Sequence, residues 1–233
     1  ELDPELNGEW ISGSTIYTEG ESMYRSYIVK YAGVDAATGY PLYWTKTTPA
    51  ADATEEEKAA FVPEWYATSN YDEAYANGRQ ATDDLLPTVY GGLGTSLDFY
   101  GFDFSIQMAY QLGGKIFDYS YQALMHNGDG SSAGQNWHVD MAKAWTPENT
   151  NTDVPRLNRS DKYTNKLTDR WLTSSNYLSV NNITLGYTLP KNWVNKFRCQ
   201  NLTLSVTGQN LGYWTSSATP IPDYQQYSSG TTS

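Results

Sequence analysis

The sequence predicts an all-β protein built on long, antiparallel, amphipathic strands. The first observation is strict alternation of apolar and polar residues over 102–112, which is typical of a strand with two different faces. The second is a similar run over 93–99, separated from the first by only Tyr100 and Gly101, as a tight hairpin requires. The third is the alternation of short connections with long ones (46–88 and 113–175), a pattern of outer-membrane barrels.

If the predicted sheet is part of a barrel wall, alternate residues of the strand over 102–112 lie in two different environments. The polar set, Asp103, Ser105, Gln107 and Gln111, would then face the lumen. The apolar set would face lipid and consists of Phe102, Phe104, Ile106, Met108 and Tyr110.

Further strands are expected on both sides of this hairpin. Two weaker ones cover 23–32 and 41–45, joined by the short segment GVDAATGY. A strand over 177–189 changes phase at Asn181–Asn182, which predicts a β-bulge there, and a last one covers 201–210.

Two helices are expected within the long connections. Residues 54–61 read as a short helix with Thr54 as N-cap and acidic residues in its first turn, and a second helix is expected at 137–145. The first helix lies in a strongly acidic stretch between Asp52 and Asp84.

Composition excludes several classes of protein. The net charge of -11 and pI near 4.5 argue against a nucleic-acid partner, which needs clustered Lys and Arg. A mean hydropathy of -0.60 with no long apolar run excludes a transmembrane helix. The single cysteine, Cys199, rules out an intrachain disulfide, and the 20 Tyr and 8 Trp argue against disorder.

Aromatic residues in or beside the long connections are the candidate substrate-binding groups, because flat sugar faces stack on such rings. The alternative is that these rings pack the loops or form an interfacial aromatic girdle. The candidates are Trp65, Tyr66, Trp137, Trp145, Trp171 and Trp214.

Other chemistry finds little support in the residues. Catalysis of glycoside hydrolysis would need a matched carboxyl pair, and the acids that could supply one occur in runs typical of a solvated surface (Glu55, Glu56, Glu57, Asp83 and Asp84). We expect no metal site and no cofactor. The alternative to a plain polar turn at 127–132 is a Ca²⁺ ion held by loop oxygens.

Three segments resemble the final third of SusC/RagA-like TonB-dependent outer-membrane transporters. They are PTVYGGLGTSLDFYGFDFSIQMAYQLGGKIFD (87–118), NYLSVNNITLGYTLPKNWVNKF (176–197) and LTLSVTGQNLGYWT (202–215). Residues 27–44 and 145–161 fit the same region, so that the resemblance spans about residues 23–215.

The resemblance implies that residues 1–233 are the C-terminal part of a large antiparallel transmembrane β-barrel with long extracellular loops. The family's N-terminal extension, plug domain and TonB box are not in this sequence, and its final strand is not found after QQYSSGTTS, so we expect a piece of a longer protein. The implied function is TonB-dependent nutrient import across the bacterial outer membrane, without enzymatic activity. The implied partners are a SusD-like surface lipoprotein and, through the missing N-terminal region, the TonB complex. The substrate is most often an oligosaccharide in this family and a peptide in some members.

A soluble, secreted carbohydrate-binding β domain is the alternative of another class. It explains the same aromatic residues and the acidic pI. It does not explain strands of eleven residues, because strands of soluble proteins usually run to about five or six.

Overall fold

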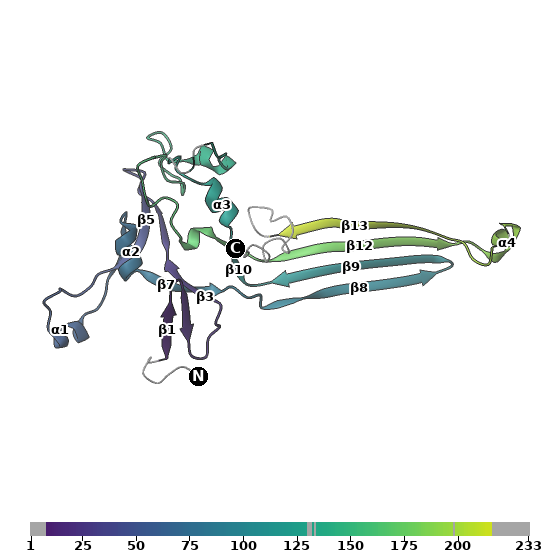
Figure 1. Ribbon diagram of the computed structural model, residues 1–233, viewed down its shortest axis with the longest axis horizontal. Helices are drawn as coiled ribbons and strands as arrows, with labels where there is room; N and C mark the ends of the chain where they lie inside the picture. The colour runs from purple at the N-terminus through teal and green to yellow at the C-terminus, as the bar shows by residue number, and fades with distance from the viewer. Residues whose placement is uncertain (1–7, 130–131, 133, 198, 216–233) are drawn as a thin grey trace. The chain divides into compact units, whose positions relative to one another are not determined.

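The structure is a computed structural model that describes residues 8–129, 132, 134–197 and 199–215 (Figure 1). The chain divides into two compact units. We call Leu86–Lys115 with Ser174–Ser233 the sheet unit, and Glu1–Leu85 with Ile116–Thr173 the loop unit. The expectation that the family's final strand is missing concerns the C-terminal end of the chain, where residues 216–233 lie outside the described part.

The sheet unit is a single antiparallel layer of four long strands in the order β13-β12-β9-β8 (Figure 1). These are β8 (Val89–Phe99), β9 (Phe102–Leu112), β12 (Tyr177–Thr188) and β13 (Thr203–Thr215). The prediction for β9 is confirmed at both ends, whereas β8 begins earlier and β13 ends later than expected. A short helix α4 (Lys191–Val194) and a 3-10 turn η5 (Asn195–Phe197) connect β12 to β13.

The turn and the bulge predicted for this sheet are both confirmed. Tyr100 and Gly101 have φ angles of 48° and 86°, so both central residues of the two-residue turn adopt the positive φ of a type I′ hairpin. The register of β12 shifts between Val180 and Asn182 against both of its neighbours. The bulge lets Leu178 and Ile183 share one face although their positions differ by an odd number.

The loop unit holds two small sheets. One has the order β1-β2-β3-β7 and consists of β1 (Glu9–Ser12), β2 (Thr15–Thr18), β3 (Arg25–Val29) and β7 (Arg79–Asp84). The other has the order β4-β5-β6 and consists of β4 (Tyr31–Val34), β5 (Pro41–Lys46) and β6 (Trp65–Thr68). The single strand expected over 23–32 is therefore two strands that belong to different sheets.

The two long connections contain more regular structure than the two helices expected there. Residues 46–88 contain β6, β7, α1 (Glu55–Ala60) and α2 (Tyr71–Asn77). Residues 113–175 contain α3 (Tyr119–Leu124), two 3-10 helices η3 (Val139–Lys143) and η4 (Asp169–Trp171), and the pair β10 (Lys115–Phe117) and β11 (Leu172–Ser174). No described helix is long and apolar enough to cross a membrane.

The two helix predictions have different outcomes. Thr54 caps α1 as expected: its side chain accepts from the Glu57 N–H, and the Glu57 carboxylate accepts from the Thr54 N–H at 2.8 Å. The second helix, expected at 137–145, is present but shorter, and it is not an α-helix. It is the 3-10 helix η3, and the His138 ring caps it by accepting from the Asp140 N–H.

Two separate clusters form the core of the loop unit. Val29, Tyr43, Tyr71 and Ala74 make up the first. The second consists of Met125, Met141, Ala144, Val154 and Trp171. The buried tyrosine rings of the first cluster have main-chain partners for their hydroxyls, because Tyr43 donates to the Tyr163 carbonyl at 2.7 Å and Tyr71 to the Leu167 carbonyl at 2.9 Å.

Candidate functional site

One face of the sheet unit is apolar across all four strands. Paired residues lie on the same face, and the pairing aligns Leu97, Phe104, Leu185 and Val206 in one row and Phe99, Phe102, Tyr187 and Leu204 in the next. All five residues predicted to contact lipid lie on this apolar face. Phe102 is 51% exposed, Leu185 52% and Val206 77%, so the sheet leaves much of this face open.

Glycines on the apolar face make room for neighbouring rings. Gly91 is paired with Tyr110, and a Cβ added at Gly91 would lie 3.1 Å from the Tyr110 hydroxyl. At Gly212 an added Cβ would meet the Trp214 ring at 2.4 Å. These positions explain why the predicted alternation is interrupted by glycine on strands whose neighbours carry large side chains.

The opposite face of the same sheet is polar. Thr184 and Thr207 are joined across β12 and β13 by a hydroxyl–hydroxyl hydrogen bond of 3.0 Å. Gln107, Asn182 and Gln209 form one polar row of this face. One apolar and one polar face on a single-layered sheet are the amphipathic pattern that transmembrane barrel strands have.

The aromatic candidates on β6 and beside α3 are exposed. Trp65 and Tyr66 are neighbours on β6, and the Tyr66 hydroxyl donates to Glu73, which raises the Tyr66 pKa. Trp137 is 52% exposed, and its indole N–H donates to both Nδ1 and the carbonyl of the buried His126, each at 3.1 Å. These three rings are available to a ligand, and Trp137 is held in a fixed orientation.

The structure changes the interpretation of the three remaining aromatic candidates. Trp145 is half-buried, and its indole N–H donates to the Ala36 carbonyl at 3.1 Å. This hydrogen bond connects two loops of the loop unit. Trp171 is only 1% exposed and packs in the core, which removes it from the binding candidates. Trp214 lies on β13 rather than in a loop, and its pairing with Leu178 puts it on the apolar face. We therefore regard it as a residue of that face and not as a substrate contact.

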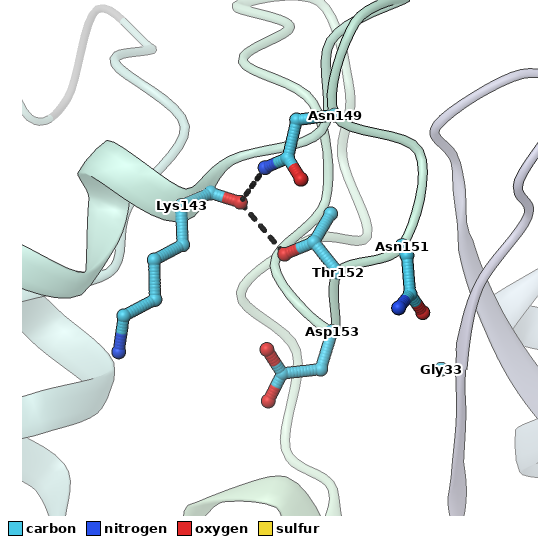
Figure 2. A pocket seen from close by; sticks show the side chains of 6 residues that line it. All are labelled: Gly33, Lys143, Asn149, Asn151, Thr152 and Asp153. Carbon is cyan, nitrogen blue, oxygen red and sulfur yellow. Dashed lines mark hydrogen bonds between the residues drawn. The ribbon is translucent and has the colours of Figure 1, made fainter.

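A solvent-open cavity of about 450 Å³ lies in the loop unit (Figure 2). It is lined by Gly33 of β4 and by Lys143, Asn149, Asn151, Thr152 and Asp153. The Lys143 carbonyl accepts from the Asn149 amide at 3.1 Å and from the Thr152 hydroxyl at 2.6 Å, which fixes the loop that forms one wall. These residues are not among the candidates predicted from the sequence, although the polar run ENTNTD (148–153), which begins three residues after Trp145, is the signal that could have found them.

Charges beside the cavity are partly compensated. The Lys143 ammonium lies 2.6 Å from Asp140, which lowers the Asp140 pKa and raises that of Lys143. Tyr31 donates to the Asp153 carbonyl at 2.9 Å, and burial raises the Tyr31 pKa to about 12. The Asp153 side chain has no ion-pair partner among the described residues, so it supplies negative charge to the cavity.

No group of three or more metal-binding side chains occurs in the part of the chain that the structure describes. The segment considered for Ca²⁺ at 127–132 includes residues 130 and 131, which lie outside that part. Its described Asp129 accepts from the Ser132 N–H at 3.1 Å, as in a polar turn.

Two curated proteins of Formosa agariphila are similar to this chain in sequence. TonB-dependent receptor P3 is 30% identical over 84% of the chain, and TonB-dependent receptor P26 is 23% identical over 65%. The chain spans only 18% and 16% of their lengths. No model of a known protein family matches the chain.

Two solved structures have a similar fold. One is the RagAB peptide transporter, with a TM-score of 0.66, 22% identity and coverage of 90% of this chain and 21% of that one. The other is the RagAB peptide importer in its "closed-closed" state, with a TM-score of 0.65, 24% identity and coverage of 89% and 21%. The sequence relatives are receptors rather than enzymes, and the predicted resemblance is confirmed.

Proposed function

We propose that this chain, which belongs to the SusC/RagA-like TonB-dependent receptors, supplies the C-terminal part of a transmembrane β-barrel that imports nutrients across the bacterial outer membrane. In this proposal the sheet unit is a section of the barrel wall and the loop unit lies on the extracellular side. Import consists of binding and gated passage, and no covalent bond is made or broken.

The observation that carries the proposal is the exposed apolar face of the sheet unit. Strands of eleven to thirteen residues are long enough to cross a bilayer, because a tilted strand needs about nine to eleven residues. A soluble β domain would cover such a face with a second layer, but the sheet unit has one described sheet only. This argues against the alternative of a soluble carbohydrate-binding domain.

For the substrate, we favour a peptide over an oligosaccharide. The two solved structures of similar fold are a peptide transporter and a peptide importer. Exposed Trp65 and Trp137 support the oligosaccharide alternative, because both rings can stack on a sugar.

For the partners, we propose a SusD-like surface lipoprotein at the extracellular side and the TonB complex at the periplasmic side. The support is the family membership together with the structured loop unit, which offers two small sheets and several exposed rings for contact. Contact with TonB would be made by a region outside this chain.

Transport by cells tests the proposal. We would delete the gene in its own bacterium, restore it on a plasmid, and measure uptake of labelled oligopeptides and labelled oligosaccharides. The proposal predicts that deletion abolishes uptake of a peptide set, that the plasmid restores it, and that collapse of the proton-motive force prevents it. Loss of oligosaccharide uptake alone would contradict the choice of peptide, and unchanged uptake of both would contradict import.

A further inference from the structure

Strand β4 (Tyr31–Val34) has a strand partner on one side only. It is the outer strand of the sheet β4-β5-β6, so its other edge has no strand beside it among the described residues. Two contacts flank β4, one at its first residue and one two residues beyond its last. The Tyr31 N–H donates to an Asp169 carboxylate oxygen at 2.7 Å, and the Ala36 carbonyl accepts from Trp145 at 3.1 Å. An unpaired strand edge is a template for another extended chain.

The cavity of about 450 Å³ lies beside this same strand (Figure 2). Its volume is in the range of ligand pockets, roughly 300–1,000 Å³. Gly33 lines it with φ of +106°, and a Cβ added at Gly33 would have no atom within 4 Å. The main chain of β4 is therefore not screened by a side chain at this position.

The other wall of the cavity carries polar groups in a fixed loop. Asn149 and Thr152 are engaged with the Lys143 carbonyl, as Figure 2 shows. In contrast, the Asn151 and Asp153 side chains form no hydrogen bond within the described chain and are exposed. An amide that can donate and accept, and a carboxylate that accepts, are groups that can bind peptide N–H and C=O groups or a cationic side chain.

We propose that the free edge of β4 binds the main chain of an extended peptide, which adds as a fourth strand to β4-β5-β6 and contacts Asn151 and Asp153. The stretch between these two contacts covers Ala32–Val34 and includes the register shift of β4 between Tyr31 and Gly33, and at about 3.3 Å per residue it pairs with a segment of about three residues. Main-chain pairing gives affinity with little dependence on peptide sequence. The unpaired Asp153 favours a peptide with a Lys or Arg near this segment. This inference rests on the proposed import of peptides.

The test uses the purified full-length receptor and two hexapeptides of Ala, Thr and Lys. One has an ordinary backbone, and the other carries an N-methyl group on every residue, which removes the main-chain donors of both strand edges. We expect calorimetry to show binding of the first peptide and at least tenfold weaker binding of the second. Amide exchange at residues 32–34 is expected to be fast in the free receptor and slowed by the ordinary peptide.

Variants locate the site. Asn151→Ala combined with Asp153→Ala is expected to weaken binding about tenfold, whereas Glu148→Ala, an exposed acid in the same loop that does not line the cavity, leaves it unchanged. The peptide pair tested on the unmodified receptor keeps the test valid if the double variant does not fold.

Three results would overturn the inference. They are equal binding of both peptides, slow exchange at 32–34 before peptide is added (which would mean that the receptor's own chain covers the edge), and displacement of the peptide by cellohexaose. If cells still import peptides while any of these is found, only the β4 site is rejected. If deletion of the gene leaves peptide uptake unchanged, the proposed function itself fails.

Discussion

An arginine at Ile106 should destabilise the protein in a bilayer because this position lies near the middle of the apolar face. Ile106 is four residues from the first residue of β9, or about 14 Å along the strand at about 3.4 Å per residue. A strand tilt of about 40° reduces this to a height of about 10 Å, close to half of the apolar band of about 25 Å. Ile106 is paired with Ile183 on β12 and with Thr95 on β8, so neither cross-strand neighbour offers the arginine a charged partner.

The expected loss for Ile106→Arg is therefore about 2–4 kcal/mol in the free energy of unfolding, the penalty for Arg at the bilayer midplane. Two controls separate membrane depth from general damage. Gln107→Arg places the same charge on the polar face and should cost close to zero. Leu204→Arg, in the row beside the hairpin, should cost about 0–1 kcal/mol because it lies near the interface.

Equilibrium unfolding by urea of the full-length receptor, reconstituted in phosphatidylcholine vesicles, measures these differences. The order of cost should be Ile106→Arg, then Leu204→Arg, then Gln107→Arg. Equal costs at Ile106 and Leu204 would refute the depth argument, and a larger cost at Gln107 than at Ile106 would refute the assignment of the faces.

Three further predictions concern the turn, the core and the pH dependence. Gly101→Ala should cost about 1–2 kcal/mol in urea unfolding, because φ is +86° and the new Cβ would lie 2.9 Å from a carbonyl oxygen, whereas Gly94→Ala, with its nearest atom at 3.7 Å, should be neutral or slightly stabilising. Trp171→Ala should cost about 3–5 kcal/mol by the same measurement, and a loss under 1 kcal/mol would contradict its place in the core. Asp140→Asn should remove a stabilisation of less than about 1 kcal/mol, since Lys143 lowers the Asp140 pKa on a partly exposed site. That stabilisation is present above about pH 4 and is lost as pH falls through the lowered pKa, so unfolding followed from pH 6 to 2 should show a shallower acid-side loss in the variant.

The sheet unit could be predicted closely because its strands carry their signal locally. Alternation from Phe102 to Leu112 defines β9, Tyr100–Gly101 defines the turn, and the phase change at Asn181–Asn182 defines the bulge. In a single-layered sheet with one apolar face, a slip of one residue would move every apolar side chain to the polar face. The alternation along each strand therefore restricts the register in which the strands can pair.

The loop unit was predicted poorly because long-range contacts determine it. The strands of its two small sheets are only four to six residues long, too short for periodicity to identify. The role of Trp171 depends on packing against residues far along the chain, such as Met125 and Met141. Trp214 was misjudged for a different reason: β13 continues beyond its predicted end, which moves this ring from a loop to the apolar face.

The cavity could not be predicted from the sequence for the same reason, because long-range contacts form it. Its polar wall at 149–153 and its Gly33 wall are more than a hundred residues apart, and only the fold brings them together. The capping box of Thr54 and Glu57, by contrast, lies within four residues and was readable from the sequence.

The central claim is that the sheet unit has lipid on its apolar face and water on its polar face. The most direct measurement is spin labelling of successive single cysteines at residues 103–108, in the full-length receptor with Cys199 replaced by Ser, in vesicles. Collision with oxygen should be high at 104, 106 and 108, and collision with an aqueous nickel complex high at 103, 105 and 107. Equal accessibility to both reagents along the strand, or the opposite alternation, would contradict the claim.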